Sequence, residues 1–179
     1  MAEALIVVDY QNDFNPGGAL AVAGGDEIAE RINALAASGD YALVVATRDW
    51  HPPDHGSFTE QGGTWPVHCV AGTSGAELHP ALDTTHVDVI LDTGVDPQTA
   101  GYSGFEATNL AELLHEHRID RVTVVGLATD YCVKHTALDA LRQGFGVDVD
   151  HSAVRGVNVS EGDSARALGE LRAAGAAIA

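Results

Sequence analysis

The chain has 179 residues, of which 45% are hydrophobic, and it carries a formal net charge of −17 at pH 7. This length suits one well-buried domain, so we expect a single domain over residues 1–179. The negative charge argues against nucleic-acid backbones and anionic membrane surfaces as partners, because both repel an acidic protein. No apolar run approaches the ~20 residues of a membrane span and the first residues lack a basic leader, which predicts a cytoplasmic protein.

Apolar, β-branched runs alternate with helical patterns along the chain. Five runs typical of buried parallel strands are expected in the centre of a sheet, and they cover residues 4–9, 41–49, 87–92, 121–126 and 146–150. Apolar residues at helical spacing occupy residues 25–39, 109–119, the stretch after Cys132, and 160–175, where Ser160 is the expected N-cap. Residues 176–179 indicate a weak edge strand. This alternation predicts an α/β fold, a three-layer doubly wound sandwich with a mainly parallel, Rossmann-like sheet.

Residues with chemically useful side chains follow the predicted strands. These candidates are Asp9, Asp49, His51, Thr93 and Cys132. In a doubly wound sheet the ligand site lies beyond the carboxyl ends of the strands, so we expect these side chains to gather at one edge. The irregular segment 51–80 is too long for an idle connection in a compact domain, and we expect it to build the site.

A second pattern in this segment suits a metal ion. The stretch RDWHPPDHGSF places Asp49, His51 and His55 within seven residues, and WPVHC adds His68. Taken singly, each of these residues is more often solvated or caps a turn. One carboxylate and several imidazoles in neighbouring loops, however, are typical ligands of Zn, Fe or Mn, so together they favour a metal site.

Cys132 lies at the start of a predicted helix, directly after a strand. The helix dipole and free N–H groups there favour the nucleophilic thiolate, although a buried free cysteine is often only a small apolar residue. Asp9 can supply the base if the fold brings it near the thiol, and otherwise caps a turn. Backbone N–H groups of Ala128 and Cys132 can form an oxyanion hole. Four aromatic residues either wall a slot for a flat substrate or pack in the core: Phe14, Trp65, Tyr102 and Phe105.

Five segments, in this order, resemble one family over nearly the whole chain: ALIVVDYQNDFNPGGALAVAGG, VVATRDWHPPDHGSF, TWPVHCVAGTSGAELHP, GYSGFEATNL and VVGLATDYCVKHTALDALRQGF. They are similar to the nicotinamidase/pyrazinamidase branch of the isochorismatase-like cysteine hydrolases. The resemblance implies a six-stranded, mainly parallel sheet between helices. It also implies hydrolysis of nicotinamide, and of pyrazinamide, to the acid and ammonia through a cysteine thioester in NAD salvage.

The resemblance further assigns roles to residues of this chain. It implies Asp9 as the base, Cys132 as the nucleophile, and an oxyanion hole at Ala128 and Cys132 after a cis peptide between Leu127 and Ala128. One divalent metal ion (Zn, Fe or Mn) would be held by Asp49, His51 and His68, with His55 added in some members. The pocket for the small-molecule substrate nicotinamide would be lined by Phe14, Trp65 and Tyr102. Family members often form dimers, so a homo-oligomer is expected.

One residue departs from the family pattern. The family places a catalytic lysine before a glycine after the third strand, whereas this chain has Thr93 before Gly94. Its only lysine, Lys134, belongs to the helix after Cys132. Three explanations stay open: another cation compensates, such as Arg48, His86 or the metal; the substrate is another small amide or the rate differs; or the protein binds its ligand with little turnover.

Overall fold

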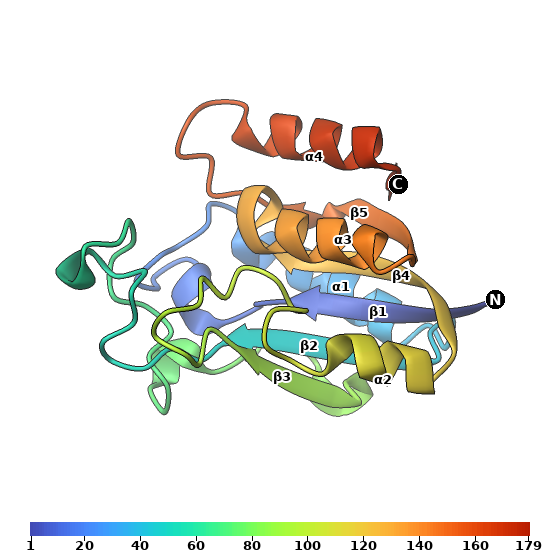
Figure 1. The fold of residues 1–179 in the computed structure, drawn as a ribbon, viewed down its shortest axis with the longest axis horizontal. Coiled ribbons are helices and arrows are strands. Elements are labelled where there is room, and N and C mark those ends of the chain that lie inside the picture. Colours follow the sequence, from blue (N-terminus) through green and yellow to red (C-terminus); the bar gives the residue numbers. More distant parts are fainter.

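Six strands form one sheet in the computed structural model, which describes residues 1–179 (Figure 1). The order is β3-β2-β1-β4-β5-β6, and every neighbouring pair is parallel. The strands are β1 (Ala2–Val8), β2 (Leu43–Asp49), β3 (Val89–Thr93), β4 (Ile119–Leu127), β5 (Gly146–Arg155) and β6 (Ala177–Ile178). This confirms the predicted α/β sandwich.

The helices lie on both faces of this sheet (Figure 1). They are α1 (Ala29–Ala36), α2 (Leu110–Glu116), α3 (Lys134–Arg142) and α4 (Asp163–Ala174). A single π-helical turn, η6 (Thr129–Val133), joins β4 to α3, and one-turn 3-10 helices are η1 (Asn12–Phe14), η2 (Gly25–Ile28), η3 (Thr59–Gln61), η4 (Ser74–Ala76) and η5 (Thr84–His86). None of the helices combines the length and the apolar character needed to cross a membrane.

Each face of the sheet has its own hydrophobic core. Along β1, Ala4, Ile6 and Val8 belong to the core shared with α2, α3 and α4. Leu5 and Val7 point the other way, into the core shared with α1. Side chains alternate across a strand, so a strand buried on both faces must be apolar at every position. This explains the continuous apolar run of β1.

Two local expectations were wrong. Residues 87–92 were expected in the centre of the sheet, but β3 is an edge strand that pairs only with β2 and leaves Ile90 44% exposed. A short apolar run does not show how many neighbours a strand has. Ser160 is not the N-cap of α4, because the residue before the helix is Gly162 in the left-handed region, and the carboxylate of Asp163 accepts a hydrogen bond from the Ser160 N–H.

The carboxyl ends of β1 to β4 and the long segment 51–80 meet at one edge of the molecule, on the left of Figure 1, while both termini lie at the opposite edge. Gln11, fully buried, ties this edge together. Its amide nitrogen donates 2.8 Å hydrogen bonds to the carbonyls of Asp49 and Ala76, and its amide oxygen accepts one from the Asp49 N–H. The end of β2 is thereby held against the segment after β1.

Candidate active site

A thiol and a carboxyl group meet at this edge. Asp9 directly follows β1 with a positive φ of 47°, and Cys132 lies in η6 after β4. Both side chains are buried, at 2% and 6% exposure. One carboxylate oxygen each of Asp9 and Asp49 and Sγ of Cys132 all lie within 4.8 Å of one another. Two neighbouring strands of the sheet therefore bring together residues that are 123 positions apart (132 − 9) in the sequence.

Burial controls the protonation of this pair. Burial, followed by the nearby Asp49 carboxylate, raises the pKa of Asp9 well above its usual range, while hydrogen bonds with Thr47 and Cys132 oppose the rise. Burial and then the charges of Asp9 and Asp49 raise the pKa of Cys132 in the same way. In the protein without a metal ion, burial and the two carboxylates therefore oppose the thiolate that the helix start was expected to stabilise.

Asp49, His51 and His68 form a second buried cluster, with ligand-type atoms within 4.8 Å of one another. Nδ1 of His51 contacts the Gly94 carbonyl at 2.9 Å, and Nδ1 of His68 contacts the Pro66 carbonyl at 2.7 Å. Because a carbonyl only accepts hydrogen bonds, each Nδ1 carries a proton, and each neutral ring offers Nε2 as a lone pair.

Both of these lone pairs face another acceptor. Oδ2 of Asp49 lies 3.3 Å from Nε2 of His51 and 3.8 Å from Nε2 of His68. Three converging acceptors repel one another unless a proton or a cation lies between them. One carboxylate and two imidazoles whose outer nitrogens bind carbonyls are the donor set and the supporting contacts of many protein metal sites. The residues present therefore fit a divalent ion.

The two imidazoles respond differently to this environment. Burial lowers the pKa of His51, but contacts with Asp49, the Gly94 carbonyl and Asp9 outweigh it and raise the pKa overall. Burial dominates at His68 and lowers its pKa. In the absence of a cation, protonation is therefore favoured at His51 over His68.

His55 does not join this cluster. Its ring stacks on His51 with centroids 3.8 Å apart, and its two nitrogens contact the Ser57 hydroxyl at 2.7 Å and the Thr99 carbonyl at 2.9 Å. With both nitrogens bound to protein groups, His55 offers no free lone pair to an ion beside Asp49. The expectation of His55 as an additional ligand is not borne out in this arrangement.

Thr93 is the last residue of β3 and is 2% exposed. The cations considered as substitutes for the family lysine lie elsewhere. Arg48 binds Asp92 at 2.6 Å and stacks on the Trp50 ring, and His86 is exposed beside Asp83. Neither Arg48 nor His86 lines the cavity, so both were wrong candidates. Arg48 precedes Asp49 in β2, and successive side chains of a strand point to opposite faces of the sheet. Lys134 pairs with Glu170 on α4 and does not line the cavity, so it does not replace the family lysine, as expected.

The peptide bond between Leu127 and Ala128 is cis, as the resemblance implies. The carbonyl of Ala128 accepts hydrogen bonds from the N–H groups of Tyr131 and Val133. The Ala128 N–H itself donates to no protein group. Ala128 and Cys132 both line the same cavity, so this free donor is available to an oxygen bound beside the thiol.

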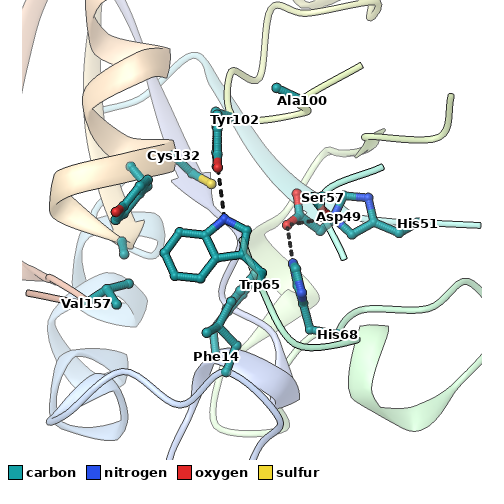
Figure 2. A pocket seen from close by; sticks show the side chains of 13 residues that line it. Phe14, Asp49, His51, Ser57, Trp65, His68, Ala100, Tyr102, Cys132 and Val157 are labelled. Carbon is teal, nitrogen blue, oxygen red and sulfur yellow. Dashed lines mark hydrogen bonds and ion pairs between the residues drawn. The ribbon is translucent and has the colours of Figure 1, made fainter. Parts of the chain in front are cut away.

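A cavity lined by Cys132, Asp49, His51 and His68 has an empty volume of about 430 Å³, part of which is open to solvent. Figure 2 shows the side chains around it. Trp65 lies across its middle, and its indole N–H donates a 2.8 Å hydrogen bond to the Tyr102 hydroxyl. Phe14 forms the wall on the side of His68, with ring centroids 5.6 Å apart. Phe105, the fourth aromatic candidate, instead stacks with Phe145 in the core.

Sequence reasoning missed several lining residues, namely Leu20, Ser57, Ala100, Tyr131 and Val157. Tyr131, adjacent to the nucleophile candidate, contacts the Trp65 ring edge to face at 4.9 Å. Val157 is held at the wall by Asp130, whose carboxylate accepts hydrogen bonds from the N–H groups of Val157 and Asn158. The aromatic Tyr131 beside Cys132 was a visible signal, whereas nothing local marked Val157.

An aromatic-lined cavity that contains Cys132, with a carboxyl partner beside the thiol and metal-type donors next to it, places this protein among the α/β enzymes that use a cysteine nucleophile. A family model described as the isochorismatase domain matches residues 3–179. The chain belongs to the isochorismatase family.

Two bacterial relatives match the chain over nearly their whole length. The chain is 43% identical to the nicotinamidase of Escherichia coli, covering 98% of this chain and 93% of the relative. It is 45% identical to the nicotinamidase/pyrazinamidase of Mycobacterium tuberculosis, covering 96% and 95%.

Solved structures share the fold. A protein from L. infantum, in a crystal structure with nicotinate, has a TM-score of 0.95 at 39% identity, covering 99% of this chain and 92% of that one. The pyrazinamidase of Pyrococcus horikoshii, in a crystal structure with zinc, has a TM-score of 0.92 at 47% identity, covering 100% and 99%.

Proposed function

We propose that this protein is a nicotinamidase, which hydrolyses nicotinamide to nicotinate and ammonia in NAD salvage and also accepts pyrazinamide. The observation that carries the proposal is one aromatic-lined cavity that reaches both Cys132, with Asp9 beside it, and the metal-type donors Asp49, His51 and His68. A flat ring that carries a carboxamide and a ring nitrogen can present the carboxamide to Cys132 and the ring nitrogen to an ion held by these donors. The names of the relatives from E. coli and M. tuberculosis support it.

Asp49, His51 and His68 would hold one divalent ion. We favour zinc over iron or manganese, because two neutral imidazoles and one carboxylate form a typical zinc donor set, and the structure from P. horikoshii contains zinc. When bound, the ion supplies a Lewis-acid anchor for the ring nitrogen of the substrate.

The chain's own residues would then do the following. Sγ of Cys132 forms a bond to the carboxamide carbon, and its proton passes to the carboxylate of Asp9. The free N–H of Ala128, with that of Cys132, donates to the oxygen of the tetrahedral intermediate. Asp9 returns the proton to the departing nitrogen as the carbon–nitrogen bond breaks, which releases ammonia and leaves a thioester. In the second half of the reaction, the oxygen of a water molecule attacks the thioester carbon while Asp9 takes a proton from that water. The carbon–sulfur bond then breaks, and Asp9 passes the proton to Sγ, so that Cys132 leaves as the thiol.

The raised pKa of Asp9 suits this exchange, because a carboxyl group that both takes and returns a proton near neutral pH is most effective with a pKa close to that pH. The aromatic walls at Phe14, Trp65 and Tyr102 would hold the ring and exclude water until the thioester forms. We further propose that residues 1–179 act as a single domain in the cytoplasm. Self-association stays a prediction, which sedimentation of the purified protein measures.

Ammonia release from nicotinamide by the zinc-loaded protein tests the proposal. We expect steady turnover that Cys132→Ala abolishes and Asp9→Asn reduces by at least ~10²-fold, as expected for loss of a general base. Benzamide, which has the same shape but no ring nitrogen, is the matched control substrate and should react much more slowly. Equal rates with benzamide and nicotinamide would contradict the proposal that the ion anchors the ring nitrogen. Turnover by Cys132→Ala would contradict a mechanism through a cysteine thioester.

Thr93 favours a second candidate function, a protein that binds nicotinamide with little turnover. No lysine or arginine lines the cavity, so the charge that the family lysine supplies has no replacement among the side chains. Tight nicotinamide binding without ammonia release, together with turnover by Thr93→Lys, would support this candidate over the first.

A further inference from the structure

Two threonines, Thr47 within β2 and Thr93 at the end of β3, each bind one carboxylate of the candidate active site. The hydroxyl of Thr47 donates a 2.7 Å hydrogen bond to Oδ1 of Asp9. The hydroxyl of Thr93 lies 3.1 Å from Oδ1 of Asp49 and 3.2 Å from the Arg48 carbonyl. Asp9 thus has a hydroxyl partner of its own, and Thr93, although it stands where the family has a lysine, serves the other carboxylate.

The contact of Thr93 determines which oxygen of Asp49 remains free. A hydroxyl has one proton, and of its two neighbours the carboxylate is the stronger acceptor. With Oδ1 engaged by Thr93, Oδ2 is the oxygen that lies 3.3 Å from Nε2 of His51 and 3.8 Å from Nε2 of His68. The hydroxyl therefore orients the carboxylate toward the two imidazoles.

The backbone around Thr93 is rigid enough for this task. Thr93 is level with Asp49 in the parallel pairing of β2 and β3, and its carbonyl accepts a 2.9 Å hydrogen bond from the Trp50 N–H. The next residue, Gly94, accepts from Nδ1 of His51 at 2.9 Å. Two adjacent residues at the end of one strand therefore support two of the three metal-type donors.

We propose that Thr93 is a positioning residue for Asp49 that strengthens the binding of the divalent ion, in place of the lysine that would supply a fixed charge at this point. The inference rests on the metal site of the proposed function. It makes the bound ion the only strong positive charge in the cavity, since no lysine or arginine lines it. This chain would therefore depend on its ion more than a relative that has the lysine.

The test compares zinc affinity, measured by competition with a chromogenic chelator at constant pH, in Thr93→Val, Thr93→Ser and the unaltered protein. Thr93→Val keeps the shape and removes the hydroxyl, and we expect it to weaken zinc about 10–100-fold, the usual loss when a partner of a metal ligand is removed. Thr93→Ser restores the hydroxyl and should bind zinc within about threefold of the unaltered protein, a smaller loss than that range. The visible spectrum of the Co²⁺ form should change in Thr93→Val and return in Thr93→Ser.

Thr123→Val is the matched control. Thr123 is also a buried strand threonine, at 8% exposure, but it lies within β4 and away from the cavity. It should leave zinc affinity unchanged. Thermal melts of the metal-free proteins check folding, and Thr93→Ala provides a second variant if Thr93→Val does not fold.

Unchanged zinc affinity and an unchanged cobalt spectrum in Thr93→Val or Thr93→Ala would overturn the inference. So would a loss in Thr93→Ser as large as in Thr93→Val, because that loss could not come from the hydroxyl. Neither result touches the proposed hydrolysis of nicotinamide, which is measured separately as ammonia. Absence of zinc binding by the unaltered protein would overturn the metal site and this inference together.

Discussion

The hydroxyl of Thr47 donates a 2.7 Å hydrogen bond to the buried carboxyl of Asp9. This bond lowers the pKa of Asp9 against the larger effects of burial and of Asp49, which raise it. Asp9 accepts the thiol proton only when it is ionised, so its activity is present above its pKa in the folded protein and lost as the pH falls through it. Thr47 therefore keeps Asp9 ionised, and the enzyme active, to a lower pH.

We expect Thr47→Val to move the acid limb of the kcat/KM profile to higher pH, because removal of the donor lets the pKa of Asp9 rise further. The shift should be about one unit or less, in keeping with ~0.5–1.5 kcal/mol for one hydrogen bond. Rates measured from mildly acidic to alkaline pH check this. A uniform loss at every pH, with the limb in place, would contradict it.

Thr93→Lys should increase the reactivity of Cys132 in the metal-free protein. An ammonium beside Asp9 and Asp49 offsets the two carboxylates that raise the pKa of the thiol, and a shift of one unit changes the thiolate fraction about tenfold. Alkylation by iodoacetamide at neutral pH, followed by mass spectrometry, measures it, with Cys69 as the internal control because it is fully buried. Equal alkylation rates of Cys132 in the two proteins would show that an ammonium group at position 93 does not change the pKa of the thiol.

Metal binding should weaken as the pH falls. The ion requires the free Nε2 of His51, and Asp49, Gly94 and Asp9 together raise the pKa of His51 above its usual value of about 6.5. Zinc affinity is therefore constant with pH above the raised pKa of His51 and falls below it, because protons compete with the ion for Nε2. Chelator competition at several pH values gives the pH at which the affinity begins to fall. A fall that begins only clearly below ~6.5 would contradict the raised pKa of His51.

Gly94→Ala should disrupt the metal site. Gly94 has a φ of +59°, and a Cβ there would overlap the ring of His51 at Cε1 and Nδ1. Gly39→Ala is the matched control, because Gly39 also has a positive φ, of +80°, but its Cβ would meet nothing within 4 Å.

Both changes should cost about 1–2 kcal/mol of stability through backbone strain, but only Gly94→Ala should lose zinc affinity. Thermal melts and chelator competition separate the two effects. Retained zinc binding in Gly94→Ala would mean that the His51 ring can move without losing its ion.

Much of the architecture was predictable because its causes are local. The continuous apolar runs of β1, β2 and β4 mark strands buried on both faces, and the parallel order brings their carboxyl ends to one edge. The candidate residues after these strands, such as Asp9 and Cys132, were therefore expected to lie close together at that edge. The family motifs added roles that spacing alone could not assign.

Other features depend on contacts between distant residues. His55 follows the same loop pattern as His51, yet Ser57 and the distant Thr99 bind both of its nitrogens. The strand runs, the edge of the sheet at which the candidate residues lie and the missing lysine are all visible in the sequence. The raised pKa of Cys132 and the contact of Thr93 with Asp49 are not, because burial and nearby charge arise from segments that meet only in the folded chain.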